Sequence, residues 1–107
     1  MDQEGSDPSF SATAAVSDGR AVVTVTGEVD MATAEAMRRT AIKDAAPAAT
    51  VDLRAVTFFD SAAIHALVQI ADHYGAPALR VLPSHQVHRV LEIAGLADQP
   101  WVCAVSD

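Results

Sequence analysis

"VTFFDSAAIHALV", residues 56–68, changes pattern in its middle, and this change decides the fold. Its first part is rich in β-branched and aromatic residues, which favour a strand, whereas the residues after Asp60 have helical apolar spacing. We expect a strand over residues 51–59 that is buried on both faces, followed by a helix over residues 61–74. A carboxylate and a hydroxyl, Asp60-Ser61, lie at the junction.

The expected helix has an apolar side and a polar side. The apolar positions recur at helical spacing and are predicted to face the core: Ile64, Leu67, Val68 and Ala71. The opposite positions form a polar stripe: Ser61, His65, Gln69 and Asp72. We therefore expect Ser61 to be accessible to another molecule.

The chain before this junction predicts a hairpin and a helix. Asp18-Gly19 is a turn pair between two β-compatible segments, residues 9–16 and 20–27, which we expect to be antiparallel strands. Residues 31–46 are rich in helix formers, and Asp30 is in position to cap that helix. Its core positions are predicted to be Ala34, Met37, Ala41 and Ile42.

The chain after the junction predicts a strand over residues 78–83 and a helix over residues 84–94. The core side of that helix is predicted to carry Val87, Val90, Leu91 and Ala94. Residues 101–105 are candidates for an edge strand. Strands that alternate with helices in this way predict an α/β fold in which helices cover a mostly parallel central sheet with an antiparallel edge.

Length and composition indicate one domain. With 107 residues, of which 50% are hydrophobic, the chain is long enough for one core and short for two. Residues 1–8 are polar and contain Gly5 and Pro8, so we expect a disordered tail there and a single domain over residues 9–107.

The charge and the length of the apolar runs argue against nucleic acid and membrane as partners. The 14 acidic residues exceed the 7 basic ones, which is unfavourable for binding the phosphates of nucleic acid. No apolar run approaches the roughly 20 residues of a membrane helix, so direct membrane insertion is not expected. The polar start lacks the pattern of an export signal, and a single cysteine, Cys103, fits a reducing compartment. We expect a cytoplasmic protein.

The junction also suits an anion. A helix that follows a strand presents free backbone N–H groups and the positive end of its dipole at that point. A phosphoryl group on Ser61 would be tolerated there by the fold and would change the surface seen by a partner. Asp and Ser are also ordinary helix caps, so a purely structural role for Asp60-Ser61 stays open, and the two roles are compatible.

The chain resembles a STAS domain of the anti-sigma-factor antagonist (anti-anti-sigma factor) type. The resemblance covers roughly residues 9–105 and rests on three stretches: "GEVD" at 27–30, "VDLRAVTFFDSAAIHALV" at 51–68 and "LRVLPSHQVHRVLEIAGL" at 79–96. They follow one another in the family's order and at its approximate spacing.

The resemblance implies a bacterial, non-enzymatic regulator of transcription that needs no cofactor. Such proteins bind an anti-sigma factor that is a serine kinase, a GHKL-type ATPase, and so free a sigma factor. The kinase phosphorylates the serine of an Asp-Ser-Ser/Thr-Gly motif and thereby breaks the complex, and a serine phosphatase resets it. Ser61 matches that serine, and Asp60 matches the preceding Asp.

The resemblance also implies the surroundings of the serine. Asp30 matches the acidic residue of the family's Gly-Glu-Leu-Asp motif, which is associated with docking. We expect the partner to bind around Ser61, at Asp30, Asp60, Ala62 and His65. Ala62-Ala63 departs from the family's Ser/Thr-Gly, and its two methyl groups are expected to alter how closely a kinase approaches.

Two other classes of function are weighed against this hypothesis. STAS-like domains also serve as constitutive adaptor subunits of lipid transporters or stress-sensing assemblies, without a phosphate cycle. Asp60, Ser61 and His65 include the residue types of a hydrolase triad, but nothing in the sequence supplies an oxyanion hole, so no catalytic residues are expected. His85 and His88 lack further identifiable ligands, so no metal site is expected.

Overall fold

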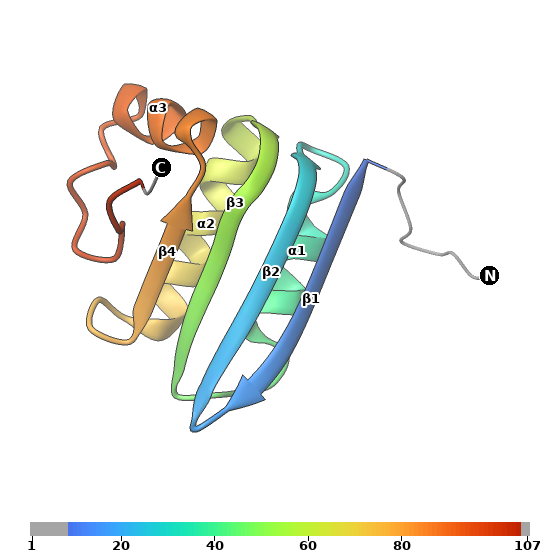
Figure 1. Ribbon diagram of the computed structural model, residues 1–107, viewed down its shortest axis with the longest axis vertical. Helices are drawn as coiled ribbons and strands as arrows, with labels where there is room; N and C mark the ends of the chain where they lie inside the picture. The colour runs from blue at the N-terminus through green and yellow to red at the C-terminus, as the bar shows by residue number, and fades with distance from the viewer. Residues whose placement is uncertain (1–8, 106–107) are drawn as a thin grey trace.

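The sheet and its helices are seen in a computed structural model that describes residues 9–105 (Figure 1). The strand order is β1-β2-β3-β4. Strand β1 (Phe10–Ser17) is antiparallel to β2 (Arg20–Val29), while β3 (Ala48–Phe59) is parallel both to β2 and to β4 (Leu79–Pro83). The predicted fold class, a mostly parallel sheet with an antiparallel edge, is confirmed. The tail expected over residues 1–8 lies outside the described residues.

The predicted hairpin is confirmed. Asp18 and Gly19 have φ angles of 53° and 76°, the left-handed backbone that a two-residue hairpin turn with the twist of the sheet requires. From this turn β1 and β2 pair residue by residue, from Ser17 opposite Arg20 to Phe10 opposite Gly27, without a bulge.

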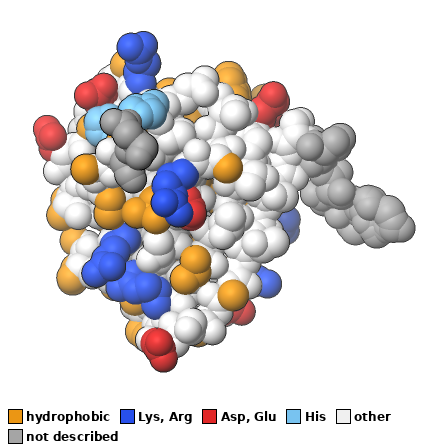
Figure 2. Space-filling model, viewed as in Figure 1, with side chains coloured by type: hydrophobic (Ala, Val, Ile, Leu, Met, Phe, Trp, Pro, Cys, Tyr) orange, Lys and Arg blue, Asp and Glu red, His pale blue; other side chains and the backbone are white. Residues whose placement is uncertain are grey.

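Helices cover one face of the sheet. Figure 1 shows α1 (Ala34–Ile42) and α2 (Ser61–Tyr74) behind the strands, and α3 (His85–Ile93) contacts β3 and β4 at one end of the sheet. Figure 2 views the open face, where the Lys and Arg side chains gather over β3 and β4. None of the helices within residues 9–105 has both the length and the apolar character needed to cross a membrane.

The prediction that β3 is buried on both faces is wrong. Val51 and Leu53 are fully buried against the helices, but the alternate residues Thr50 and Asp52 face the open side and are only half-buried. The physical reason is the polar alternation in this part of the strand, which is the pattern of a sheet with one solvated face. Arg54 reinforces that face by donating hydrogen bonds to the Asp52 carboxylate, which hold the pKa of that carboxyl below its usual value.

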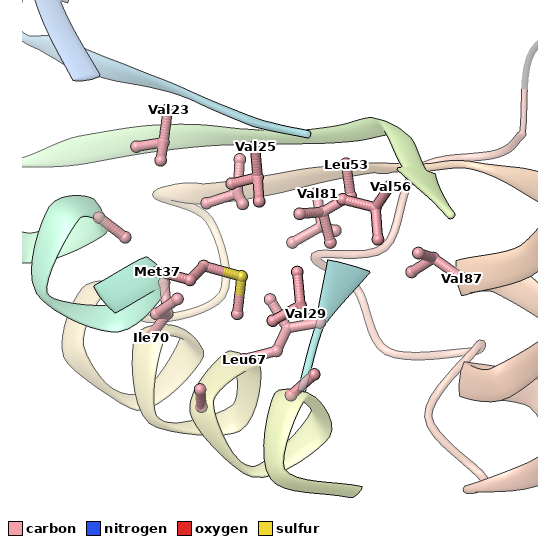
Figure 3. Packing of buried hydrophobic residues seen from close by; sticks show 14 of the residues in the cluster. Val23, Val25, Val29, Met37, Leu53, Val56, Leu67, Ile70, Val81 and Val87 are labelled. Atoms are coloured by element: carbon pink, nitrogen blue, oxygen red, sulfur yellow. The ribbon is translucent and has the colours of Figure 1, made fainter. Parts of the chain in front are cut away.

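The core lies between the sheet and the helices α1 and α2. In Figure 3, Met37 of α1 and Leu67 and Ile70 of α2 point toward the sheet. They are fully buried, as are the valines of β2 that face them: Val23, Val25 and Val29. The Tyr74 hydroxyl joins the far ends of these helices by donating a 2.5 Å hydrogen bond to the Ala41 carbonyl oxygen.

The core side of α2 is rotated from the predicted one. Leu67 is buried as expected, but Ile64, Val68 and Ala71 are only half-buried. The buried residues are Ala63, Ala66, Leu67 and Ile70. The reason is that α2 packs against α1 as well as against the sheet, so small alanines make the close contacts and larger residues lie at the border. The polar stripe is exposed as predicted: Ser61, His65, Gln69 and Asp72.

The predictions for the two remaining helices differ in accuracy. Helix α3 is confirmed, with Ser84 as its N-cap and with Val87 and Leu91 buried, whereas Val90 is half-buried and Ala94 is exposed. Helix α1 is shorter than expected and begins at Ala34, after a turn described below.

The expected edge strand over residues 101–105 is reduced to one bridge, Val81 to Val102. Val81 donates its N–H to Trp101 O at 2.8 Å, and Cys103 donates its N–H to Val81 O at 2.9 Å. This short segment nevertheless covers the outer edge of β4.

Gly27 is predicted to be required by the fold. Its φ is +86°, and a Cβ added there would lie 1.8 Å from Ser9 O. Gly27→Ala should therefore lower the free energy of unfolding by about 2 kcal/mol or more, measured by urea denaturation. Gly95→Ala is the control, because Gly95 has a φ of +78° but no atom within 4 Å of an added Cβ, so it should cost only about 1 kcal/mol. Equal losses in both variants would contradict the clash.

Candidate functional site

The carboxyl ends of β2 and β3 lie side by side and bring two acidic residues to one edge of the sheet. Val29 and Phe59 are paired in the parallel ladder, and the next residue, Asp60, donates its N–H to Val29 O at 3.3 Å. Asp30 and Asp60 therefore leave the sheet at neighbouring positions on the same edge. Two of the predicted site residues, Asp30 after β2 and Asp60 after β3, are thus brought together.

Asp60 caps α2, which is the structural role that the sequence left open for it. Its backbone is extended, with φ −102° and ψ −169°, and its carboxylate accepts the Ala63 N–H at 3.0 Å. Its carbonyl oxygen accepts the Ile64 N–H at 3.0 Å, which starts the helical ladder. These bonds fix Ser61 as the first helical residue, with its side chain exposed.

Asp30 does not cap α1, contrary to the prediction. The N-cap is Thr33, and the Asp30 carboxylate instead accepts the Ala32 N–H at 2.9 Å, closing a turn before the helix. The Asp30 carbonyl oxygen accepts the N–H groups of Thr33 at 3.1 Å and Ala34 at 2.8 Å. The cause is the short Met31–Thr33 turn, so that the helix begins at Ala34, three residues later than predicted. Asp30 is half-buried in this position.

Thr33 holds this turn and was missed by the sequence analysis. It is the buried polar side chain of residues 9–105, at 6% exposure. Its hydroxyl accepts the Asp30 N–H at 3.0 Å and lies 3.0 Å from Glu28 O, to which it donates. A hydroxyl three residues after an Asp, just before a run of helix formers, is the sequence signal that identifies such a turn.

Two exposed apolar side chains flank the carboxylates and were also missed. Met31 follows Asp30 directly and is 83% exposed, and Phe58, two residues before Asp60, is 49% exposed. Exposed large apolar side chains next to charged groups are typical of protein-binding surfaces. We call Asp30, Met31, Phe58, Asp60 and Ser61 the junction surface.

The other predicted site residues lie on the first turns of α2. His65 is exposed one turn beyond Ser61, and Ala62 is half-buried against the core. Ala63 is fully buried, so its methyl group points into the core and away from the junction surface. The expectation that two methyl groups alter the approach of a kinase therefore reduces to Ala62.

His85 and His88 lie on the first two turns of α3. His88 Nδ1 lies 3.8 Å from a Glu92 carboxylate oxygen on the same helix. Within residues 9–105 the structure contains no group of three or more side chains able to hold a metal ion.

Comparison with known proteins identifies a family and several similar structures. The model of the STAS domain family matches residues 11–107. The crystal structure of an anti-sigma factor antagonist from Mycobacterium paratuberculosis is 28% identical, covers 88% of this chain and 85% of its own, and has a TM-score of 0.77. No curated protein sequence gives a significant match.

Two further structures are similar in fold. The anti-sigma factor antagonist SpoIIAA in its unphosphorylated form is 22% identical over 92% of this chain and 89% of its own, with a TM-score of 0.66. The Bacillus cell fate determinant SpoIIAA in the phosphorylated form is 21% identical over 92% of both chains, with a TM-score of 0.61.

Asp60 is predicted to stabilise α2 through its cap. Asp60→Ala removes the acceptor of the Ala63 N–H and should lower the free energy of unfolding by about 1 kcal/mol, measured by urea denaturation. Asp60→Asn keeps an acceptor oxygen and should retain most of that stability. If both variants were as stable as the wild type, the cap would not contribute as described.

Proposed function

The chain belongs to the STAS domain family, and from this we propose that it is an anti-sigma-factor antagonist controlled by phosphorylation of Ser61. Unmodified, it binds and sequesters an anti-sigma serine kinase of the GHKL-type ATPase class in the cytoplasm of a bacterium, and so regulates transcription. The observation that carries this proposal is the exposed Ser61 at the start of α2, beside Asp30 and Asp60.

The position of Ser61 suits modification. Its side chain is exposed on the first helical residue, so the hydroxyl can be reached without opening the fold. The backbone around it is held by the Asp60 cap, which fixes the position of Ser61 at the start of the helix. The methyl group of Ala63 is buried, and this leaves the approach to Ser61 open on that side.

The fold around Ser61 suits a phosphoryl group as well as a hydroxyl. The cap and the helical ladder use the N–H groups of Ala63 and Ile64, whereas those of Ser61 and Ala62 have no acceptor within residues 9–105. These two donors and the positive end of the helix dipole favour an anion at this point. Phosphorylation should therefore leave the domain folded and act on binding.

The junction surface suits a partner with an apolar patch and a basic rim. Met31 and Phe58 supply exposed apolar area, and Asp30 and Asp60 supply negative charge beside it. A phosphoryl group adds about −1.5 to −2 charges at this place. Burying that group in the complex would cost desolvation and space, which gives the physical basis for dissociation. A serine phosphatase, the second proposed partner, would restore binding.

A constitutive adaptor is the second candidate function. It is favoured by the structural roles of both aspartates. The turn closed by Asp30 and the cap formed by Asp60 explain why acidic residues lie at these positions without any phosphate cycle. In this case the domain would be a permanent subunit of a lipid transporter or a stress-sensing assembly, with Ser61 unmodified.

Ser61→Asp is predicted to weaken kinase capture without loss of fold. Used as bait in native lysate, it should capture about tenfold less GHKL-type ATPase than the wild type, quantified by mass spectrometry. Its unfolding temperature should be unchanged or slightly raised, because the new carboxylate lies at a helix N-terminus.

Two control variants separate the switch from general effects. Ser61→Ala removes the hydroxyl without adding charge and should retain capture. Gln69→Asp adds the same charge on the same exposed stripe, two turns away, and should also retain it. Equal capture of the kinase by Ser61→Asp would refute the switch, and capture of a transporter or scaffold by every bait would favour the adaptor.

A further inference from the structure

Strand β1 has an open edge. It is the first strand in the order of the sheet and pairs only with β2, and Figure 1 shows no element of residues 9–105 beyond it. The opposite edge, at β4, is covered by the segment around Val102, which forms a β-bridge to Val81 of that strand. Within residues 9–105 the sheet thus has one covered edge and one edge whose outward backbone groups have no partner.

The register of the hairpin identifies those free groups. In a two-residue hairpin the residues next to the turn exchange both backbone hydrogen bonds, so Ser17 and the odd-numbered residues before it bond to β2. The N–H and C=O groups of the even-numbered residues point outward from the sheet: Phe10, Ala12, Ala14 and Val16.

The strand lacks the features that normally prevent pairing at an edge. Its sequence, "FSATAAVS", contains no charged residue and no proline, although 20% of the chain is charged. It pairs with β2 without a bulge, whereas the irregularities of the sheet lie between β2 and β3. In Figure 2 the cluster of Lys and Arg side chains lies away from it, over β3 and β4. A regular, uncharged open edge is a template for another strand.

We propose that this other strand is β1 of a second copy, so that two chains form a dimer with one continuous sheet. The strand is complementary to itself when antiparallel: with Thr13 on the two-fold axis, Ala12 lies opposite Ala14 and Phe10 opposite Val16. All four of these residues have outward backbone groups, so this register uses the whole free edge.

The side chains support this pairing. Val16 is 51% exposed in the single chain and would lie next to the second strand, opposite Phe10, so that pairing would reduce its exposure. Small residues at the central positions, Ala12, Thr13 and Ala14, allow the strands to approach, and no charges meet across the axis. A charged segment of another protein would find no complementary charge on this strand.

The dimer leaves the junction surface free. Antiparallel pairing points the carboxyl ends of β2 and β3 of the two copies toward opposite ends of the sheet, so both Ser61 residues stay accessible. The inference does not depend on the proposed function.

Sedimentation of the full chain over a wide range of protein concentration tests the dimer. The wild type should pass from monomer to dimer as concentration rises. Thr13→Lys brings two positive charges together at the axis and should weaken dimerisation about fivefold or more. An equimolar mixture of Thr13→Lys and Thr13→Glu should restore it, because opposite charges then meet at the axis.

Thr24→Lys is the matched control. Thr24 lies directly opposite Thr13 on β2 and is also exposed on the open face. The substitution therefore adds the same charge one strand away from the edge. It should dimerise nearly as the wild type does. A wild type that stays monomeric at every concentration, or equal weakening by both lysine variants, would overturn the proposal.

Discussion

The joining of β2 and β3 at their carboxyl ends is the constraint on which the site depends. The hydrogen bond from Asp60 N–H to Val29 O holds the last residues of both strands together, and the chain turns into a helix from each of them. Because the strands are parallel, the residues that follow them meet at one edge. Asp30 and Ser61, thirty-one positions apart in the sequence, thus become neighbours of one surface.

The same side chains serve the fold and the surface. Asp60 caps α2 through one carboxylate oxygen, and Asp30 closes the turn that Thr33 holds before α1. These roles fix negative charge beside Ser61 and the exposed Met31, so the surface is preorganised. A phosphoryl group on Ser61 would lie next to the free N–H groups of its own helix. It would also add negative charge to the surface that a partner contacts. Stability and binding therefore respond to it differently.

The sequence predicted those features that depend on neighbouring residues. Asp18-Gly19 predicted the hairpin, and Asp60-Ser61 predicted the start of α2 to the residue. The sequence-based prediction was wrong where the burial of a residue depends on packing between distant segments. The rotation of α2 toward Ala63 and Ala66 follows from its packing on α1. The exposure of Met31 and Phe58 likewise required the tertiary structure. The solvated side of β3, by contrast, had a local signal in the polar alternation of Thr50 and Asp52, which the prediction missed.

The central claim concerns Ser61 in the cell, where a kinase either uses this hydroxyl or does not. The most direct measurement is phosphosite mapping by mass spectrometry of the protein purified from native cells across growth conditions. The account predicts phosphate on Ser61 in part of the molecules, and none on the exposed serines of β1, Ser11 and Ser17. An unmodified Ser61 under every condition, including those in which the bound kinase is recovered, would contradict it.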